Sequence, residues 1–150
     1  MAGRRDQITM TPAEIEAFLE SERTLQVASI NGDGTPHLVA MWFARFRGEL
    51  GFWTYAKSQK VVNLRRDPRL TVMVESGEKY EDLKGVTISG TARIVEDLDE
   101  VFAFGDVVYE RYWGTVDHDR VRAMGGKRVL VVIDQDKVVS WDHTKLGGSY

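Results

Sequence analysis

A strong turn sequence between two extended segments restricts the fold of this chain more than any other feature. The turn is Asn31-Gly32-Asp33-Gly34, which combines residue types that tolerate the positive φ angles of tight turns. Residues 25–30 before the turn alternate with a period of two, and residues 36–46 after it form a second, longer extended segment. Together the three parts predict an antiparallel β-hairpin.

Short strands and tight turns also make up most of the remaining sequence. Further strands are predicted at residues 50–54, 69–75, 85–95, 127–133 and 137–141, with turns at residues 47–49 and 134–136. Helices are predicted from Thr11 onward and at residues 58–66, 97–112 and 117–124. Consecutive strands joined by short turns are typical of an antiparallel barrel and not of alternating βαβ units. We therefore expect a mainly β fold, a β-barrel of six to seven antiparallel strands with peripheral helices.

The length and the two ends of the chain predict one domain with loose termini. A chain of 150 residues has the usual size of a single domain, and no repeat or linker divides residues 1–150. Residues 1–10 are predicted to be a loose N-terminal arm. Thr11 then caps a helix, because Pro12 fits the first helical position and Glu14 can complete a capping box. Residues 144–150 are predicted to be a flexible, glycine-containing tail.

The composition excludes several classes of site. The chain has no cysteine, which removes disulfides, thiolate metal sites, iron–sulfur clusters and thiol nucleophiles. His37, His118 and His143 do not have the spacing of a metal motif, so no metal site is predicted. No phosphate-binding P-loop and no nucleophilic serine elbow occurs. If the protein is an enzyme, its reactive chemistry therefore comes from an organic cofactor.

The charge and hydropathy of the sequence exclude some classes of binding partner and predict a cellular location. The formal net charge of -3 argues against general binding to nucleic acid or to acidic membranes, which requires a basic face. No apolar run approaches the roughly 20 residues that span a membrane, and the polar first residues lack the apolar segment of a signal peptide. We expect no nucleic-acid partner, no membrane span and a cytoplasmic location.

Residues 51–70 form a basic cluster within this acidic chain. A single acid opposes five cations, which are Lys57, Lys60, Arg65, Arg66 and Arg69. Lys57 and Lys60 flank Ser58 where a predicted strand passes into a predicted helix, and free N–H groups at a helix start point toward an anion placed there. The hydroxyl groups of Thr54 and Ser58 can donate as well. The segment is therefore either a phosphate cradle or a solvated basic helix end.

The cluster lies in a stretch that resembles a known family. Phe52-Trp53-Thr54-Tyr55-Ala56-Lys57-Ser58-Gln59-Lys60 resembles the phosphate-binding segment of the pyridoxamine 5′-phosphate oxidase-like split β-barrel family. Asp33-Gly34-Thr35-Pro36-His37 and Gly85-Val86-Thr87-Ile88-Ser89-Gly90-Thr91-Ala92 resemble its first hairpin and a later strand, so the similarity covers most of residues 24–95. The closing Ser140-Trp141-Asp142-His143-Thr144-Lys145-Leu146 resembles the actinobacterial B group of flavin/deazaflavin oxidoreductases, which use coenzyme F420.

The resemblance implies an FMN-binding split-barrel-like fold and a homodimer with two cofactor sites at its interface. The implied cofactor is coenzyme F420, with FMN as the alternative. Flavin-binding members usually have Ser-Arg-Lys where this chain has Ser58-Gln59-Lys60, a departure that weakens the assignment of FMN. The residues implied in cofactor binding are Pro36, His37, Val39, Met41, Trp53, Thr54, Lys57, Ser58, Gln59, Lys60, Val74 and Glu75.

The roles of these residues follow the same resemblance. The segment Trp53-Thr54 is implied to lie along the cofactor ring, and the lysines and Ser58 to hold the phosphate. The strand that begins at Pro36 is implied to line the other side of the ring. Four aromatic residues, Trp42, Phe43, Phe52 and Trp53, are expected in the barrel core or the dimer interface, with Trp53 an equal candidate for contact with the ring.

The implied function is that of an F420-dependent oxidoreductase, which transfers hydride between reduced deazaflavin and a small electron-poor organic substrate. Two alternatives stay open: an FMN-dependent oxidase or reductase on the same barrel, and a non-catalytic F420- or haem-binding protein. No catalytic residue is assigned, since bound water, His37 and Tyr80 are equal candidates for a proton donor. Arg65 and Arg66 are either a solvated helix face or contacts to the anionic coenzyme tail.

Overall fold

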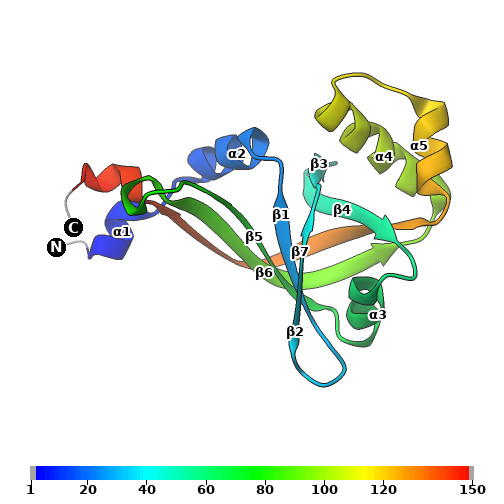
Figure 1. Cartoon of the computed structure of the whole chain (residues 1–150), viewed down its shortest axis with the longest axis horizontal. Helices are drawn as coiled ribbons and strands as arrows, with labels where there is room; N and C mark the ends of the chain where they lie inside the picture. The colour runs from blue at the N-terminus through cyan, green and yellow to red at the C-terminus, as the bar shows by residue number, and fades with distance from the viewer. Residues whose placement is uncertain (1–2, 149–150) are drawn as a thin grey trace.

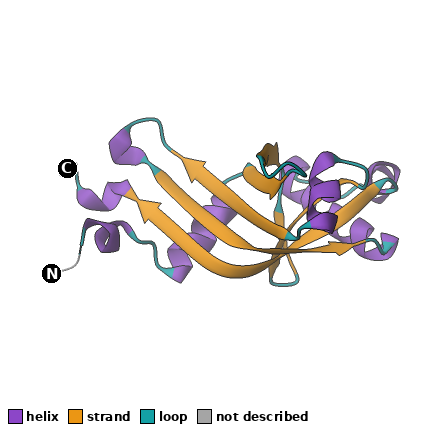
Figure 2. Cartoon of the chain, turned by 90° about the horizontal axis from the view of Figure 1, so that it is seen from below, coloured by secondary structure: helices purple, strands orange, loops and turns teal. Residues whose placement is uncertain are grey.

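The computed structural model describes residues 3–148, and an antiparallel sheet of seven strands is its central element (Figure 1). The strands are β1 (Leu25–Ile30), β2 (Pro36–Met41), β3 (Ala44–Phe46), β4 (Glu49–Tyr55), β5 (Arg69–Ser76), β6 (Lys84–Val95) and β7 (Arg128–Asp142). Their order is β2-β1-β5-β6-β7-β4-β3, so two strands that follow each other in the chain form the two edges. Figure 2 shows the long strands curving across the molecule. The mainly β, split-barrel prediction is confirmed.

Within residues 3–148, five helices and two short 3₁₀ turns lie around this sheet. They are α1 (Arg4–Ile8), α2 (Pro12–Ser21), α3 (Gln59–Arg66), α4 (Leu98–Trp113), α5 (His118–Gly125), η1 (Tyr80–Asp82) and η2 (His143–Leu146). The start of α2 has the predicted capping box: the Glu14 amide donates to Thr11 Oγ1, and the Thr11 amide donates to the Glu14 carboxylate over 2.7 Å. No helix among residues 3–148 is long and apolar enough to cross a membrane.

Two strand predictions are wrong in their extent. Residues 36–46 do not form one strand. Strand β2 ends before Trp42, and the chain passes through Trp42 and Phe43 to β3 at the opposite edge of the sheet. Residues 134–136 do not form a turn but belong to the continuous strand β7. There the pairing shifts beside Gly90, where a Cβ atom would lie 2.0 Å from the Asp134 carbonyl oxygen. The glycine lets the two backbones approach, and the extra residue is absorbed as a β-bulge.

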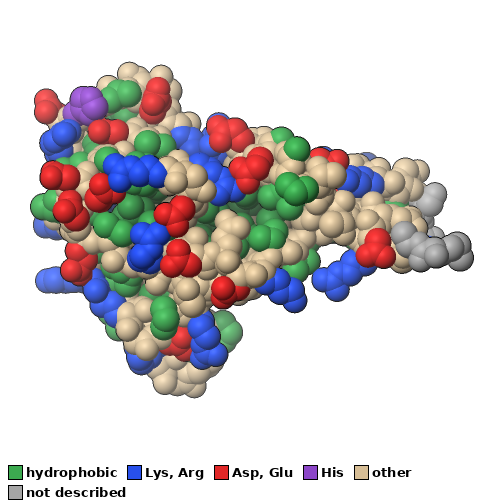
Figure 3. Space-filling model, turned by 180° about the vertical axis from the view of Figure 1, so that it is seen from behind, with side chains coloured by type: hydrophobic (Ala, Val, Ile, Leu, Met, Phe, Trp, Pro, Cys, Tyr) green, Lys and Arg blue, Asp and Glu red, His purple; other side chains and the backbone are tan. Residues whose placement is uncertain are grey.

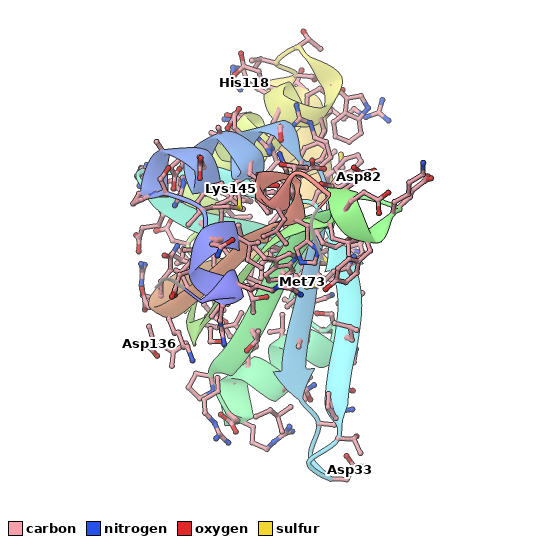
Figure 4. The ribbon with its side chains drawn as sticks, turned by 90° about the vertical axis from the view of Figure 1, so that its left-hand side faces the viewer. Asp33, Met73, Asp82, His118, Asp136 and Lys145 are labelled. Carbon is pink, nitrogen blue, oxygen red and sulfur yellow. The ribbon has the colours of Figure 1, made fainter. Side chains whose placement is uncertain are left out.

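The prediction of a loose N-terminal arm is also wrong for the described part of residues 1–10. Residues 4–8 form α1, and the buried Met10 donates its amide to Ser140 Oγ over 3.0 Å. From η2, Lys145 donates to the Thr9 carbonyl and to the Glu14 carboxylate, and it lies beside the N-terminal helices in Figure 4. The predicted flexible tail therefore begins as an ordered turn. Residues 149 and 150 lie outside the described residues.

Two separate apolar clusters lie on the two faces of β4. The inner cluster fills the curled sheet and contains Phe52, whereas the outer cluster packs α4 and α5 against the sheet and contains Trp53. The alternation arises because neighbouring side chains of a strand point to opposite faces. Figure 1 shows α4 and α5 at the same end of the sheet as α3, away from α1. This end carries the features described next.

Candidate functional site

The corner between β4 and α3 carries an unsatisfied polar atom. Ser58 is the N-cap of α3, but its side chain makes no capping hydrogen bond. Its hydroxyl oxygen is buried and has no hydrogen-bond partner among the described residues. Buried polar atoms are nearly always hydrogen-bonded in folded proteins, so an orphaned one at a helix start indicates a group that would bind there. The first amides of α3 lie at the same corner and favour an anion.

Lys60 places a buried cation in the first turn of α3, two residues after Ser58. Only 8% of Lys60 is exposed, and its Nζ donates to Thr54 Oγ1 over 2.8 Å. Within residues 3–148 no carboxylate lies within ion-pair distance of this ammonium group. Burial lowers the pKa of Lys60, and the nearby positive charge of Arg128 lowers it further. A buried charge without a counter-charge is costly, and a bound anion would remove that cost.

The structure distinguishes Lys60 from the other cations of the basic cluster. Arg65 pairs with Glu96 at 2.5 Å, and Arg66 donates to the Ile30 carbonyl over 2.5 Å. Arg69 pairs with Asp67 and holds the pKa of that carboxyl at about 2. Figure 3 shows acidic and basic side chains intermixed over the face turned away from Figure 1. Lys57 and Arg66 also have no ion-pair partner among residues 3–148, but both are exposed, so Lys60 is distinguished by the burial of its unpaired charge.

Asn63 fixes α3 against the β1–β2 hairpin. Its side chain is fully buried, and Nδ2 donates to Ser29 Oγ over 3.1 Å and to Asn31 Oδ1 over 3.0 Å. Ser29 is paired across the strands with His37, and side chains of such pairs lie about 5 Å apart. His37 Nδ1 is, after Ser58 Oγ, another buried polar atom without a partner among the described residues. The hairpin thus brings another orphaned polar atom to the side of the sheet that α3 covers.

The structure gathers only part of the predicted site. It brings together Thr54, Ser58 and Lys60 at the β4–α3 corner. Lys57 and Gln59 are exposed at the same corner, and the Gln59 side chain donates to Asn63 over 2.8 Å.

The other predicted site residues lie on three strands of the sheet. On β2, Pro36 is exposed and His37, Val39 and Met41 are half-buried on the inner side. On β5, Val74 is buried in the inner core, and Glu75 lies on the outer face beside Leu38. Trp53 is 6% exposed and packs under α4 and α5.

Arg128 is a candidate binding residue that the sequence did not indicate. It begins β7 and pairs with Tyr55 of β4, and its guanidinium carbon lies 4.4 Å from the centre of the Tyr55 ring and 5.0 Å from that of Trp53. Its Nε donates to the Met124 carbonyl over 3.0 Å, and no carboxylate of the described chain pairs with it. More than 70 residues separate it from Tyr55, so only the strand pairing reveals their proximity.

Comparison with known proteins identifies the family. The family model for pyridoxamine 5′-phosphate oxidase matches residues 11–142. The chain belongs to this family. The match includes the hairpin and the β4–α3 corner, so the resemblance to the pyridoxamine 5′-phosphate oxidase-like family is confirmed over most of the sequence. Among curated proteins, no sequence matched the chain.

Solved structures support the same family. Conserved hypothetical protein Rv2991 from Mycobacterium tuberculosis is 45% identical, with 99% of this chain and 95% of that chain covered and a TM-score of 0.92. An F420 reductase is 29% identical, with 82% and 94% covered and a TM-score of 0.67. HutZ, the haem storage protein from Vibrio cholerae, is 18% identical, with 86% and 94% covered and a TM-score of 0.70. At this last level of identity the likeness concerns the fold alone.

Proposed function

We propose that the β4–α3 corner binds the phosphate of a redox cofactor and that the protein is an F420-dependent oxidoreductase with a cytoplasmic location. The observation that carries this proposal is that a buried lysine without an acidic partner, Lys60, and the orphaned hydroxyl of Ser58 occur at the same β4–α3 corner. The 29% identity to an F420 reductase favours the deazaflavin. The Ser58-Gln59-Lys60 sequence and the closing segment, which resembles the B group, favour it as well. FMN is the second candidate, because it also carries a phosphate group.

The residues of the corner divide the task of binding. Lys60 supplies the full positive charge, Ser58 and the first amides of α3 donate hydrogen bonds, and Thr54 holds the ammonium group in place. Exposed Lys57 adds a flexible second charge at the rim. The half-buried inner face of β2, with Val39 and Met41, offers an apolar wall beside the cradle. Binding here would desolvate the cofactor and fix its orientation toward a substrate.

When bound, reduced F420 supplies hydride from its ring carbon to an electron-poor carbon of a small organic substrate. The chain contributes orientation and exclusion of water, and it offers no covalent nucleophile. Of the two side chains considered as proton donors, His37 lies beside α3. Tyr80 lies in η1 against the ring of His143, at the other end of the sheet. Bound water is the third source of the proton.

Titration of the purified protein with F420 and with FMN tests the assignment. We expect F420 to bind with a dissociation constant in the micromolar range or below and FMN to bind more weakly, because Gln59 replaces a cation of the flavin-binding pattern. Tight binding of FMN alone would assign the protein to the flavin-dependent branch. Binding of haem but of neither coenzyme would favour a carrier, and so would tight F420 binding without turnover of activated alkenes and quinones.

We also propose that two copies of the chain form a homodimer through the outer face of β1, β2 and β5. Leu38 on this face is 68% exposed, and a groove runs along it between Ala28, Met73 and Thr87. An exposed apolar face of this kind is typical of an interface. Sedimentation analysis should give the mass of a dimer for the unmodified protein. The variant Leu38→Glu should shift the mass toward a monomer, whereas Val62→Glu, on the exposed side of α3, should not. A monomeric unmodified protein would contradict the proposal.

A further inference from the structure

A second binding feature, which we term the aromatic groove, lies next to the cradle between the end of β2, β4 and the helices α4 and α5. It has a volume of about 310 Å³, and its lining includes Met41, Trp42, Trp53, Trp113, Met124 and Arg128. A volume near 300 Å³ corresponds to the smaller small-molecule pockets of proteins. Ala40 and Val108 complete the lining, so three tryptophans, two methionines and two small aliphatic side chains surround a single cation.

The rings of the aromatic groove are held rigidly. Trp42 stacks on Tyr112 at 4.2 Å with 13° between the planes, and its edge meets Trp113 at 4.9 Å. Trp113 in turn stacks on Tyr109 at 4.6 Å. The Tyr112 hydroxyl accepts from the Phe43 amide over 2.9 Å, which anchors the stacked rings to the connection between β2 and β3. Two tryptophans in this fixed stack still have 42% and 46% of their surface exposed.

Rigid, half-exposed indole rings favour a flat ligand. Exposure of a large aromatic surface is unfavourable in water, and a planar ring placed against it recovers both burial and stacking energy. Little conformational entropy is lost on binding, because the rings already pack against one another. A flexible aliphatic ligand would gain less from the same surface.

The cation gives the groove its charge preference. Arg128 is fixed by stacking on Trp53 and Tyr55 and by its bond to Met124, so its guanidinium group is positioned without a carboxylate partner in the described chain. Guanidinium groups bind carboxylates in two parallel hydrogen bonds. Arg128 pairs with Tyr55 across β4 and β7, and the neighbouring Thr54 accepts from Lys60. The groove therefore adjoins the phosphate cradle, and Lys60 does not line it.

We propose that the aromatic groove binds a planar aromatic or conjugated carboxylate and that this molecule is the acceptor substrate of the enzyme. The role as acceptor rests on the proposed function, whereas the binding of an aromatic acid rests on the groove alone. The rings hold the flat body of the substrate, and Arg128 holds its carboxylate. The groove should therefore prefer aromatic compounds with a negatively charged carboxylate over neutral aromatic compounds.

Calorimetric titration with 2-naphthoate and with neutral 2-naphthamide tests the groove. The unmodified protein should bind the acid about 10-fold or more tightly than the amide. Arg128→Gln should abolish that preference, and Arg128→Lys should retain only part of it, because lysine keeps the charge but loses the two parallel hydrogen bonds. Trp113→Leu should weaken both ligands by about 3- to 10-fold through loss of stacking. Arg122→Gln is the matched control. Arg122 is on α5, lies over the Phe102 ring of α4 and does not line the groove.

The same titrations repeated with F420 present separate the two proposals. An acid affinity that changes less than about 3-fold when F420 saturates the protein supports an acceptor subsite beside the cofactor. Competition between the two molecules would show that the groove holds the cofactor and would overturn the inference. Equal binding of acid and amide, or no binding, would overturn it as well. If the acid binds with the expected Arg128 dependence and F420 does not bind, the proposed cofactor is wrong and the aromatic-acid site stands.

Discussion

Replacement of Lys60 by methionine is expected to weaken cofactor binding by about 10- to 150-fold and, at the same time, to stabilise the protein without ligand. The loss in affinity corresponds to one charge-assisted contact of about 1.5–3 kcal/mol. The stabilisation has the opposite origin, because methionine fills a similar volume and removes a buried charge that has no acidic partner. A gain of about 1 kcal/mol would raise the melting temperature by about 2–4 °C for a protein of this size.

The pH dependence of stability provides a second measurement of the same charge. Burial lowers the pKa of Lys60 in the folded state, so the unfolded chain binds more protons between the folded and the unfolded pKa values. Stability should therefore rise with pH across that window in the unmodified protein, and Lys60→Met should flatten the rise. A bound anion favours the charged lysine, so a saturating phosphate ligand should also reduce the rise.

Lys57→Met is the matched control for this prediction. Lys57 lies three residues earlier and is exposed, so its removal should leave the melting temperature nearly unchanged and weaken binding by only a few-fold. An unchanged dissociation constant in Lys60→Met would mean that the phosphate lies elsewhere. A lower melting temperature of the ligand-free variant would mean that the ammonium group stabilises the fold, contrary to the proposed role.

The elements that the sequence predicted well depend on local chemistry. The turn at residues 31–34 and the capping box of α2 are set by residues within four positions of one another, and both occur in the structure. The limits of α3 follow the same rule, because Ser58 occupies the position before its first residue and Pro68 disfavours helix at the residue before it. Local signals of this kind do not depend on which strands become neighbours.

The elements that the sequence predicted poorly depend on contacts between distant residues. Residues 134–136 contain two acids and resemble a turn, yet they extend β7 because Gly90 of β6 lets the backbones approach. The break after Met41 follows from the closure of the sheet, which sends β2 and β3 to opposite edges. In each case the deciding partner lies far away in the chain, so the periodicity of the segment itself gives the wrong extent.

The candidate site shows the same division. The lysines and Ser58 at the β4–α3 corner were predicted from their position before a helix, but only the structure separates buried Lys60 from Arg65 and Arg66, which have partners of their own. Arg128 could not be predicted, because its place beside the corner depends on the pairing of β4 with β7. Of the aromatic residues expected in the core, Phe43, Phe52 and Trp53 are buried, whereas Trp42 is 42% exposed and lines the groove.

Replacement of Gly105 by valine is expected to lower the free energy of unfolding by about 3 kcal/mol, at the upper end of the usual cost of overpacking. Gly105 is buried in α4, where a Cβ atom would lie 2.5 Å from Trp53 Cζ3 and 2.7 Å from Val121 Cγ1. Neither neighbour can withdraw freely, because both belong to the cluster between the helices and the sheet. The melting temperature should fall by about 6–12 °C, measured by circular dichroism.

The indole of Trp53 is the cause of this effect, which a double-mutant cycle can establish. Trp53→Leu alone should destabilise the protein by leaving a cavity, but Gly105→Val on that background fills part of the space, so the double variant should lose less than the sum of the two single losses. Gly126→Ala is the control, since its Cβ would have no neighbour closer than 3.7 Å and the backbone there is helical. Additive losses in the cycle, or an unchanged melting temperature in Gly105→Val, would mean that α4 can move away from β4. In that case Trp53 would not be held as a fixed wall of the aromatic groove.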